Sequence, residues 1–167
     1  IFDLDSIQAA GLATVLINNA IHPGEPCGVD ASAKLAEDLL TVGVIPNSQV
    51  ITCIIPAYNV GGMLNRGCCS RANQDGPEEY GFRGNAKNLD LNRDFMKADA
   101  ENTKAFYKIY HDWKPQIFVD AHSTNGADYP AEMTLINTAR SRVEESMRVF
   151  FNGGMTNALY KDMIREG

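Results

Sequence analysis

The chain has little of what several large classes of protein require. Its 167 residues carry 15 Lys and Arg against 21 Asp and Glu, a net charge of −6, so it lacks the basic face that binds a nucleic-acid backbone. No apolar run approaches the ~20 residues that cross a bilayer. What remains, 44% hydrophobic and 22% charged, is an ordinary globular composition, with enough residues for one domain and its core.

Cysteine is also scarce, and its spacing removes a common type of metal site. The four cysteines show none of the C-x-x-C spacing of a structural zinc site. Cys53 lies in an apolar segment and is predicted to be a small buried residue. Cys68 and Cys69 are adjacent, so each is expected to need another partner for an unstrained disulfide. The redox compartment stays undecided, and no signal peptide is visible in a chain that begins at Ile1.

The apolar pattern predicts an α/β fold. Short apolar runs rich in β-branched residues indicate strands, and longer amphipathic stretches indicate helices, the first of them with Asp30 at its N-cap. The first thirteen residues lack a clean period and are expected to form a lead-in or an edge segment. The expected strands are 14–19, 49–55, 116–122 and 132–137, and the expected helices are 31–40, 98–113 and 139–165, the last interrupted at 152–154.

The order of these elements favours a sheet of mainly parallel strands. Strand, helix, strand, long loop, helix, strand is typical of an α/β sheet with right-handed crossovers. We therefore expect a single domain over 1–167, with a mixed, largely parallel sheet flanked by helices. The stretch 56–97 has little periodicity, and a loop of that length in a compact domain is usually functional or disordered. Its arginines and asparagines favour function.

Two histidines and a glutamate form a candidate metal site. His22 and Glu25 lie three residues apart in His22-Pro23-Gly24-Glu25, and His122 follows a predicted strand far along the chain. Two imidazoles and one carboxylate are the ligands of a catalytic zinc whose fourth position holds a water, which the metal acidifies. Both histidines sit where a strand ends, as ligands of open α/β sheets do. The alternative is a loop histidine, a surface glutamate and a strand-end histidine that are unrelated in space.

Metal-bound imidazoles usually donate their second N–H to a carboxylate or a carbonyl. Asp90 and Asp120 are therefore the natural candidates for these outer partners.

Several segments resemble the zinc metallocarboxypeptidases, the carboxypeptidase A/B-like family. The stretches 81–85 (Gly-Phe-Arg-Gly-Asn) and 88–95 (Asn-Leu-Asp-Leu-Asn-Arg-Asp-Phe) resemble that family's substrate-binding segment, and 56–62 is similar to its Asn-Pro-Asp-Gly turn. With the His-x-x-Glu motif and the strand-end histidine in the family's order, the resemblance covers about residues 14–137. It implies a carboxypeptidase-like fold, a phosphorylase/hydrolase-like sandwich, that binds one zinc ion.

The resemblance also implies roles for single residues. His22, Glu25 and His122 match the zinc ligands, and Asp90 matches an aspartate that orients a zinc-bound histidine. Asn92 and Arg93 match the pair that grips the substrate's terminal carboxylate, a role suited to the fork of an arginine.

Three further residues are less firmly placed. Arg71 is the best match to the arginine that stabilises the oxyanion, with Arg66 as its rival. Ser123 is expected near the substrate or, equally, as a polar residue at the strand end. Arg83 is expected to anchor the loop rather than to border the cleft.

The chain departs from the family pattern in two ways. Digestive members carry an arginine between the two ligands of the triplet, where this chain has Gly24. The family's general-base glutamate and its closing tyrosine follow the second histidine, and no segment after Leu135 resembles the surroundings of either. Either the chain is an amino-terminal portion of the enzyme, incomplete at its carboxyl end, or the protein lacks the base. We expect the first.

The expected function is hydrolysis of the C-terminal peptide bond of a peptide by zinc-activated water. The substrate would be a peptide with a free C-terminal carboxylate, and family habit favours a secreted or periplasmic location. Two alternatives stay open. The aspartoacylase-like deacylases share the zinc ligands and a carboxylate-binding arginine but cleave N-acyl amino acids, and a zinc-containing module could recognise peptide C-termini without cutting them.

Overall fold

The structure, a computed structural model, describes residues 4–41, 49–71, 77–124 and 126–166. It divides the chain into two compact units, Ile1–Ala127 and Asp128–Gly167; the expectation of one domain over 1–167 stays a prediction. The elements of the first unit are α1 (Leu4–Ala9), β1 (Ala13–Asn18), α2 (Cys27–Thr41), β2 (Val50–Ile55), α3 (Val60–Leu64), β3 (Arg66–Gly67), β4 (Tyr80–Gly81), the 3₁₀ turn η1 (Leu91–Arg93), α4 (Glu101–Trp113) and β5 (Ile117–Asp120).

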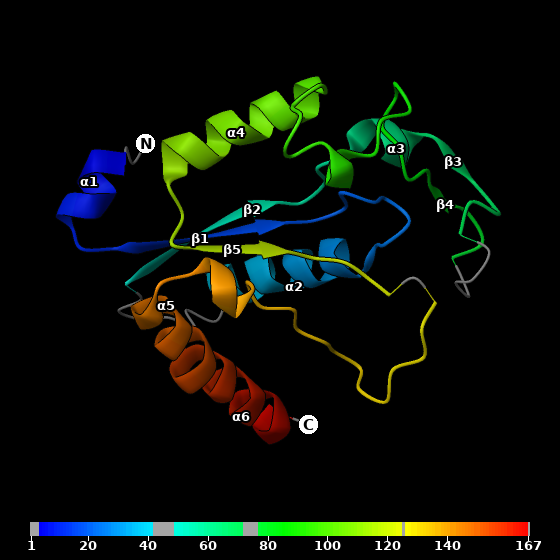
Figure 1. Cartoon of the computed structure of the whole chain (residues 1–167). Helices are drawn as coiled ribbons and strands as arrows, with labels where there is room; N and C mark the ends of the chain where they lie inside the picture. Colours follow the sequence, from blue (N-terminus) through cyan, green and yellow to red (C-terminus); the bar gives the residue numbers. More distant parts are fainter. Residues whose placement is uncertain (1–3, 42–48, 72–76, 125, 167) are drawn as a thin grey trace. The chain divides into compact units, whose positions relative to one another are not determined.

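A three-stranded parallel sheet forms the centre of this unit. Its strand order is β2-β1-β5, with β1 parallel to both neighbours, and α2 and α4 lie on opposite faces of it (Figure 1). Strands β3 and β4 form a separate antiparallel pair inside the long loop. The structure thus confirms an α/β fold with a parallel sheet flanked by helices, and three of the four predicted strands.

The core lies between the sheet and α4. Along β1, the alternate residues Thr14, Leu16 and Asn18 are buried, as the period of a strand requires. Leu16 belongs to one apolar cluster with Phe106 of α4 and Tyr58 of the long loop. The Phe106 ring lies 5.6 Å from the Tyr58 ring, centre to centre. Aromatic pairs at this distance add to the apolar burial, so the cluster holds α4 and the long loop on the sheet.

Helix boundaries differ from the prediction in three places. The expected lead-in contains α1, which buries the side chain of Ile7. Helix α2 begins at Cys27, four residues before the predicted start, because the Pro26 carbonyl already accepts the amides of Val29 and Asp30. Asp30 is therefore a first-turn residue and not the N-cap.

Helix α4 begins at Glu101 rather than at 98. The buried carboxylate of Asp94 accepts hydrogen bonds from the amides of Asp99 and Ala100 and from the Thr103 hydroxyl. These bonds satisfy the two backbone donors directly before the first helical residue and tie Thr103 of the first turn to the preceding loop. Asp94, which immediately follows the Asn92-Arg93 pair, therefore has a structural role.

The second unit contains no strand at 132–137, so the fourth predicted strand is wrong. All six residues lack regular structure and all but one are exposed. A strand needs a neighbour to pair its backbone groups, and none of the described residues supplies one. The regular elements of this unit are the 3₁₀ turn η2 (Arg140–Arg142), α5 (Glu145–Val149), the π-helical turn η3 (Phe150–Met155) and α6 (Thr156–Glu166).

The predicted helix over 139–165 therefore begins later, at Glu145. Its predicted interruption at 152–154 is wrong, because the chain stays helical there and widens into the π-helical turn. Within the described ranges, no helix combines the length and the apolarity needed to cross a membrane.

Candidate metal centre

The ends of two neighbouring strands carry the two histidines. Asn18 and Asp120 are the last paired residues of β1 and β5; His22 follows four residues after Asn18, and His122 two residues after Asp120. The long loop fixes the path after β1: the Tyr58 and Asn59 amides donate to backbone carbonyls of residues 19 and 20. The predicted placement at strand ends is therefore what the structure shows.

His22, Glu25 and His122 come together as a single cluster. One ligand atom from each lies within 4.8 Å of the other two. The Nδ1 atom of His22 lies 3.0 Å from Glu25 Oε1, and the Nδ1 atom of His122 lies 3.0 Å from Glu25 Oε2. His22 and Glu25 are 3% and 2% exposed, so neither is the surface residue of the alternative interpretation.

Each histidine turns its other nitrogen to an aspartate. His22 Nε2 lies 3.3 Å from Asp90 Oδ1, and His122 Nε2 lies 2.9 Å from Asp120 Oδ2. The structure therefore brings both predicted outer carboxylates to the imidazoles. This pattern fixes the tautomer and orientation of an imidazole that binds metal through its remaining nitrogen.

The donor set fits zinc. Two imidazole nitrogens and one carboxylate, all converging through Nδ1 and Oε atoms, are the ligands of a catalytic zinc site. The Glu25 carboxylate also accepts the Ser123 amide at 3.0 Å and pairs with Arg71 at 2.9 Å. In this cluster, hydrogen-bond donors and a guanidinium compensate the negative charge of the buried Glu25 carboxylate. A bound cation would compensate the same charge.

These contacts shift the protonation of the cluster. Burial raises the pKa of the Glu25 carboxyl, but hydrogen bonds from His122, His22 and the Ser123 amide outweigh it and hold that pKa well below its usual range. Hydrogen bonds to Asp120 and Glu25 raise the pKa of His122 to about 9, against the lowering effect of burial. The metal-free His122 is therefore cationic at neutral pH.

We expect zinc binding to release a proton near neutral pH. Because the pKa of His122 is about 9 in the metal-free protein, zinc must displace a proton from this ligand at pH 7.5. The zinc affinity should rise with pH by about tenfold per unit and level off above pH 9. Calorimetry in two buffers of different ionisation enthalpy measures the release, and an enthalpy that does not depend on the buffer contradicts the expectation.

Arg71 lies on the cluster, and Gly24 makes room for it. The Arg71 guanidinium pairs with Glu25 Oε1 and its side chain is 7% exposed. A Cβ atom at Gly24 would lie 2.5 Å from Arg71 Cδ and 3.3 Å from the Gly81 carbonyl oxygen. The glycine at position 24 thus leaves that space to Arg71. Its rival Arg66 is exposed and donates to the Glu79 carbonyl.

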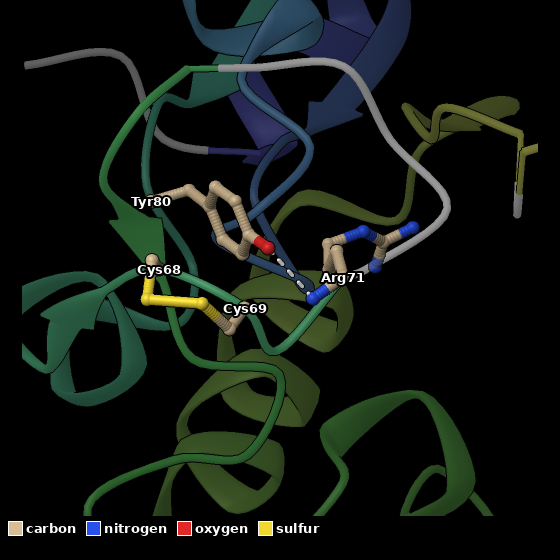
Figure 2. Close-up of a disulfide and its surroundings, with 4 residues drawn as sticks. All are labelled: Cys68, Cys69, Arg71 and Tyr80. Atoms are coloured by element: carbon tan, nitrogen blue, oxygen red, sulfur yellow. Dashed lines mark hydrogen bonds between the residues drawn. A yellow bond between two sulfur atoms is a disulfide. The ribbon is translucent and has the colours of Figure 1, made fainter.

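A tyrosine and a disulfide lie beside Arg71 (Figure 2). The Arg71 amide donates to the Tyr80 hydroxyl oxygen at 2.8 Å, and Tyr80 is buried. Cys68 and Cys69 form a disulfide with each other, so the expectation that each needs another partner is wrong. Cys69 has a left-handed backbone conformation, φ 77°. Cys53 is half-buried and packs against the core.

Arg83 is a second arginine at the cluster, where the sequence favoured a purely structural role. Its Nε donates to Asp90 Oδ2 at 2.9 Å, and its NH1 lies 3.5 Å from His22 Nδ1, the nitrogen that faces Glu25. Burial raises the pKa of Asp90, but the hydrogen bonds from Arg83 and His22 outweigh burial and hold that pKa below its usual value. Arg83 therefore both anchors the loop through Asp90 and reaches the metal-facing side of His22.

The predicted carboxylate-binding pair, Asn92 and Arg93, is linked to the cluster through Asp90. The backbone amide of Asn92 donates to Asp90 Oδ1, the oxygen that also faces His22. Arg93 follows in the 3₁₀ turn η1, is exposed, and donates to the Asn92 carbonyl. Ser123 meets the cluster through its backbone amide. The geometry thus joins Asn92 to the site, and Arg93 has its guanidinium on the surface.

Comparison of this chain with protein-family models, with curated proteins and with solved structures finds no match.

Proposed function

We propose that the chain holds one zinc ion through His22, Glu25 and His122 and acts as part of a zinc-dependent metallocarboxypeptidase. The observation that carries this proposal is the convergence of both Nδ1 atoms on the Glu25 carboxylate, while both Nε2 atoms face aspartates. The carboxypeptidase-like arrangement of the fold is part of the same proposal, and the parallel sheet with its site at the strand ends supports it.

Bound zinc would acidify a water molecule and polarise the scissile carbonyl. The residues of the chain orient the metal ligands and neutralise negative charge at the site. Asp90 and Asp120 hold the two imidazoles, and Arg71 and Arg83 place positive charge beside the cluster, where a preorganised guanidinium stabilises an oxyanion. The general base is proposed to come from outside these residues, since Glu25, Asp90 and Asp120 each already accept a histidine or an arginine.

Arg93, with Asn92, is proposed to bind the terminal carboxylate of the substrate. An exposed guanidinium can form two parallel hydrogen bonds to a carboxylate, and the turn that carries it is tied to His22 through Asp90. Ser123 is proposed to lie near the substrate, because its amide already donates to Glu25. A secreted or periplasmic location stays a prediction.

We expect the zinc-loaded protein to prefer a peptide with a free C-terminal carboxylate. Amidation of the peptide should weaken binding by about tenfold or more, because a charge-assisted bidentate contact is lost. Arg93→Ala should remove this preference. The matched control is Lys97→Ala, which removes an exposed cation paired with Asp99 on the same loop and should keep the preference. Fluorescence anisotropy of labelled peptides measures both.

Measurements of turnover, made beside the binding assay, separate the alternatives. Cleavage of an N-acyl amino acid without binding of peptides would support a deacylase, and binding of peptides without turnover by the complete protein would support a recognition module. Hydrolysis of peptides that survives both metal chelation and His122→Ala would contradict the proposed function.

A further inference from the structure

The last paired residues of β1 and β5 lie directly before the metal cluster. Asn18 and Asp120 are register partners across these two parallel strands, and the Ala121 amide donates to the Asn18 carbonyl at 2.9 Å. Both strands end at this pair, and His122 follows two residues later. The side chains of this pair therefore stand between the sheet and one metal ligand.

A continuous chain of hydrogen bonds runs from Asn18 to the cluster. Asn18 Nδ2 donates to Asp120 Oδ1 at 2.8 Å, Asp120 Oδ2 faces His122 Nε2 at 2.9 Å, and His122 Nδ1 faces Glu25 at 3.0 Å. An aspartate carboxylate with a hydrogen bond to only one of its oxygens can still rotate about its Cβ–Cγ bond. The contact to Asn18 holds the second oxygen and so fixes the plane of the Asp120 carboxylate.

The side-chain amide of Asn18 lies where a polar group lowers the stability of the fold. Its side chain is 0% exposed, and its Oδ1 atom has no hydrogen-bond partner among the described residues. An unsatisfied buried polar atom costs stability, whereas an apolar side chain of similar size would not. The opposite orientation of the amide would set Oδ1 against Asp120 Oδ1, two acceptors in contact, so the observed orientation follows from the chemistry of the pair.

We propose that Asn18 is a positioning residue for the metal ligand His122, acting through Asp120. Among the described residues, its side chain donates to Asp120 and to none of the three metal ligands. Its amide locks the Asp120 carboxylate, which then holds His122 with Nε2 outward and Nδ1 toward Glu25. This inference rests on the proposed zinc site and adds the residue that sets the orientation of one of its ligands.

The test compares zinc affinity and stability in Asn18→Leu. The substitution removes both the bond to Asp120 and the unpartnered oxygen, so the metal-free protein should keep its stability while the zinc affinity falls by about tenfold, the lower range for loss of a group that orients a ligand. The visible spectrum of bound Co²⁺ should change as well. A residue with a structural role alone would alter stability and leave affinity and spectrum unchanged.

Two further variants sharpen the test. Thr14→Val removes a polar group from another buried position on the same face of β1 and should leave the zinc affinity unchanged. In an Asp120→Asn background, Asn18→Leu should have no additional effect on affinity, because the path through Asp120 is already cut. Asn18→Ala, which is smaller than the native residue, is measured in the same way in case Asn18→Leu does not fold.

The outcomes are distinguishable. A protein that binds no zinc overturns the proposed function and this inference with it. A protein that binds zinc with an affinity unchanged by either Asn18 variant overturns this inference alone, as does an equal loss in Thr14→Val.

Discussion

The variant His122→Ala is expected to lose tight zinc binding. His122 is one of three ligands, and its Nδ1 atom lies 3.0 Å from the carboxylate of Glu25, another of them. Each ligand of such a site contributes several kcal/mol of the binding free energy, so the dissociation constant should increase on the order of a thousandfold. Competition with a chromophoric chelator measures it.

His111→Ala is the matched control for this variant. The chain has three histidines, and His111 is the one outside the cluster, exposed on α4. Its removal should leave the dissociation constant within twofold. Equal losses in both variants would show that zinc binds histidines without selecting the cluster.

Glu25→Gln is expected to destabilise the metal-free protein by about 3–5 kcal/mol, the cost of removing one partner from a buried ion pair. One carboxylate oxygen of Glu25 meets His22 and Arg71, and the other meets His122 and the Ser123 amide. A glutamine would point its NH₂ group at two of these donors and remove the carboxylate that pairs with Arg71. Urea unfolding in the presence of a chelator measures the change.

Glu37→Gln provides the comparison. It is the same chemical change on the exposed surface of α2, where Glu37 pairs with Lys34. Exposed pairs of this kind contribute about 0–1 kcal/mol. A destabilisation by Glu25→Gln no larger than that of Glu37→Gln would contradict the account of a carboxylate that organises the cluster.

The site was more predictable from sequence than the boundaries of the fold. His22 and His122 could be placed together because parallel strands end at the same edge of a sheet, and the apolar runs before them are unambiguous. Asp90 and Asp120 follow from the chemistry of an imidazole, which leaves its second nitrogen in need of an acceptor.

Arg83 was harder, because its role depends on the path of a long loop without periodicity. It precedes Asp90 by seven positions, and the residues between them form neither a helix nor a strand. The position of Arg71 depends on the absence of a side chain at Gly24, a packing relation between segments that are distant in sequence. Asn18 gave no signal beyond being a polar residue in an apolar strand.

The errors outside the site have two physical origins, the need of a strand for a partner and the shortness of a helix. The run 132–137 has the composition of a strand, but strand formation depends on a neighbour that local composition does not reveal. Helix α1 was missed because it has only six residues. A segment this short gives too few turns for a helical period to be recognised.

X-ray absorption at the zinc edge tests the central claim most directly. For the protein loaded with one equivalent of zinc, the account predicts nitrogen and oxygen ligands at about 2.0–2.1 Å with outer scattering from two imidazole rings, and loss of one ring's contribution in His122→Ala. A sulfur shell at about 2.3 Å would show that cysteine holds the zinc and would contradict a site formed by His22, Glu25 and His122.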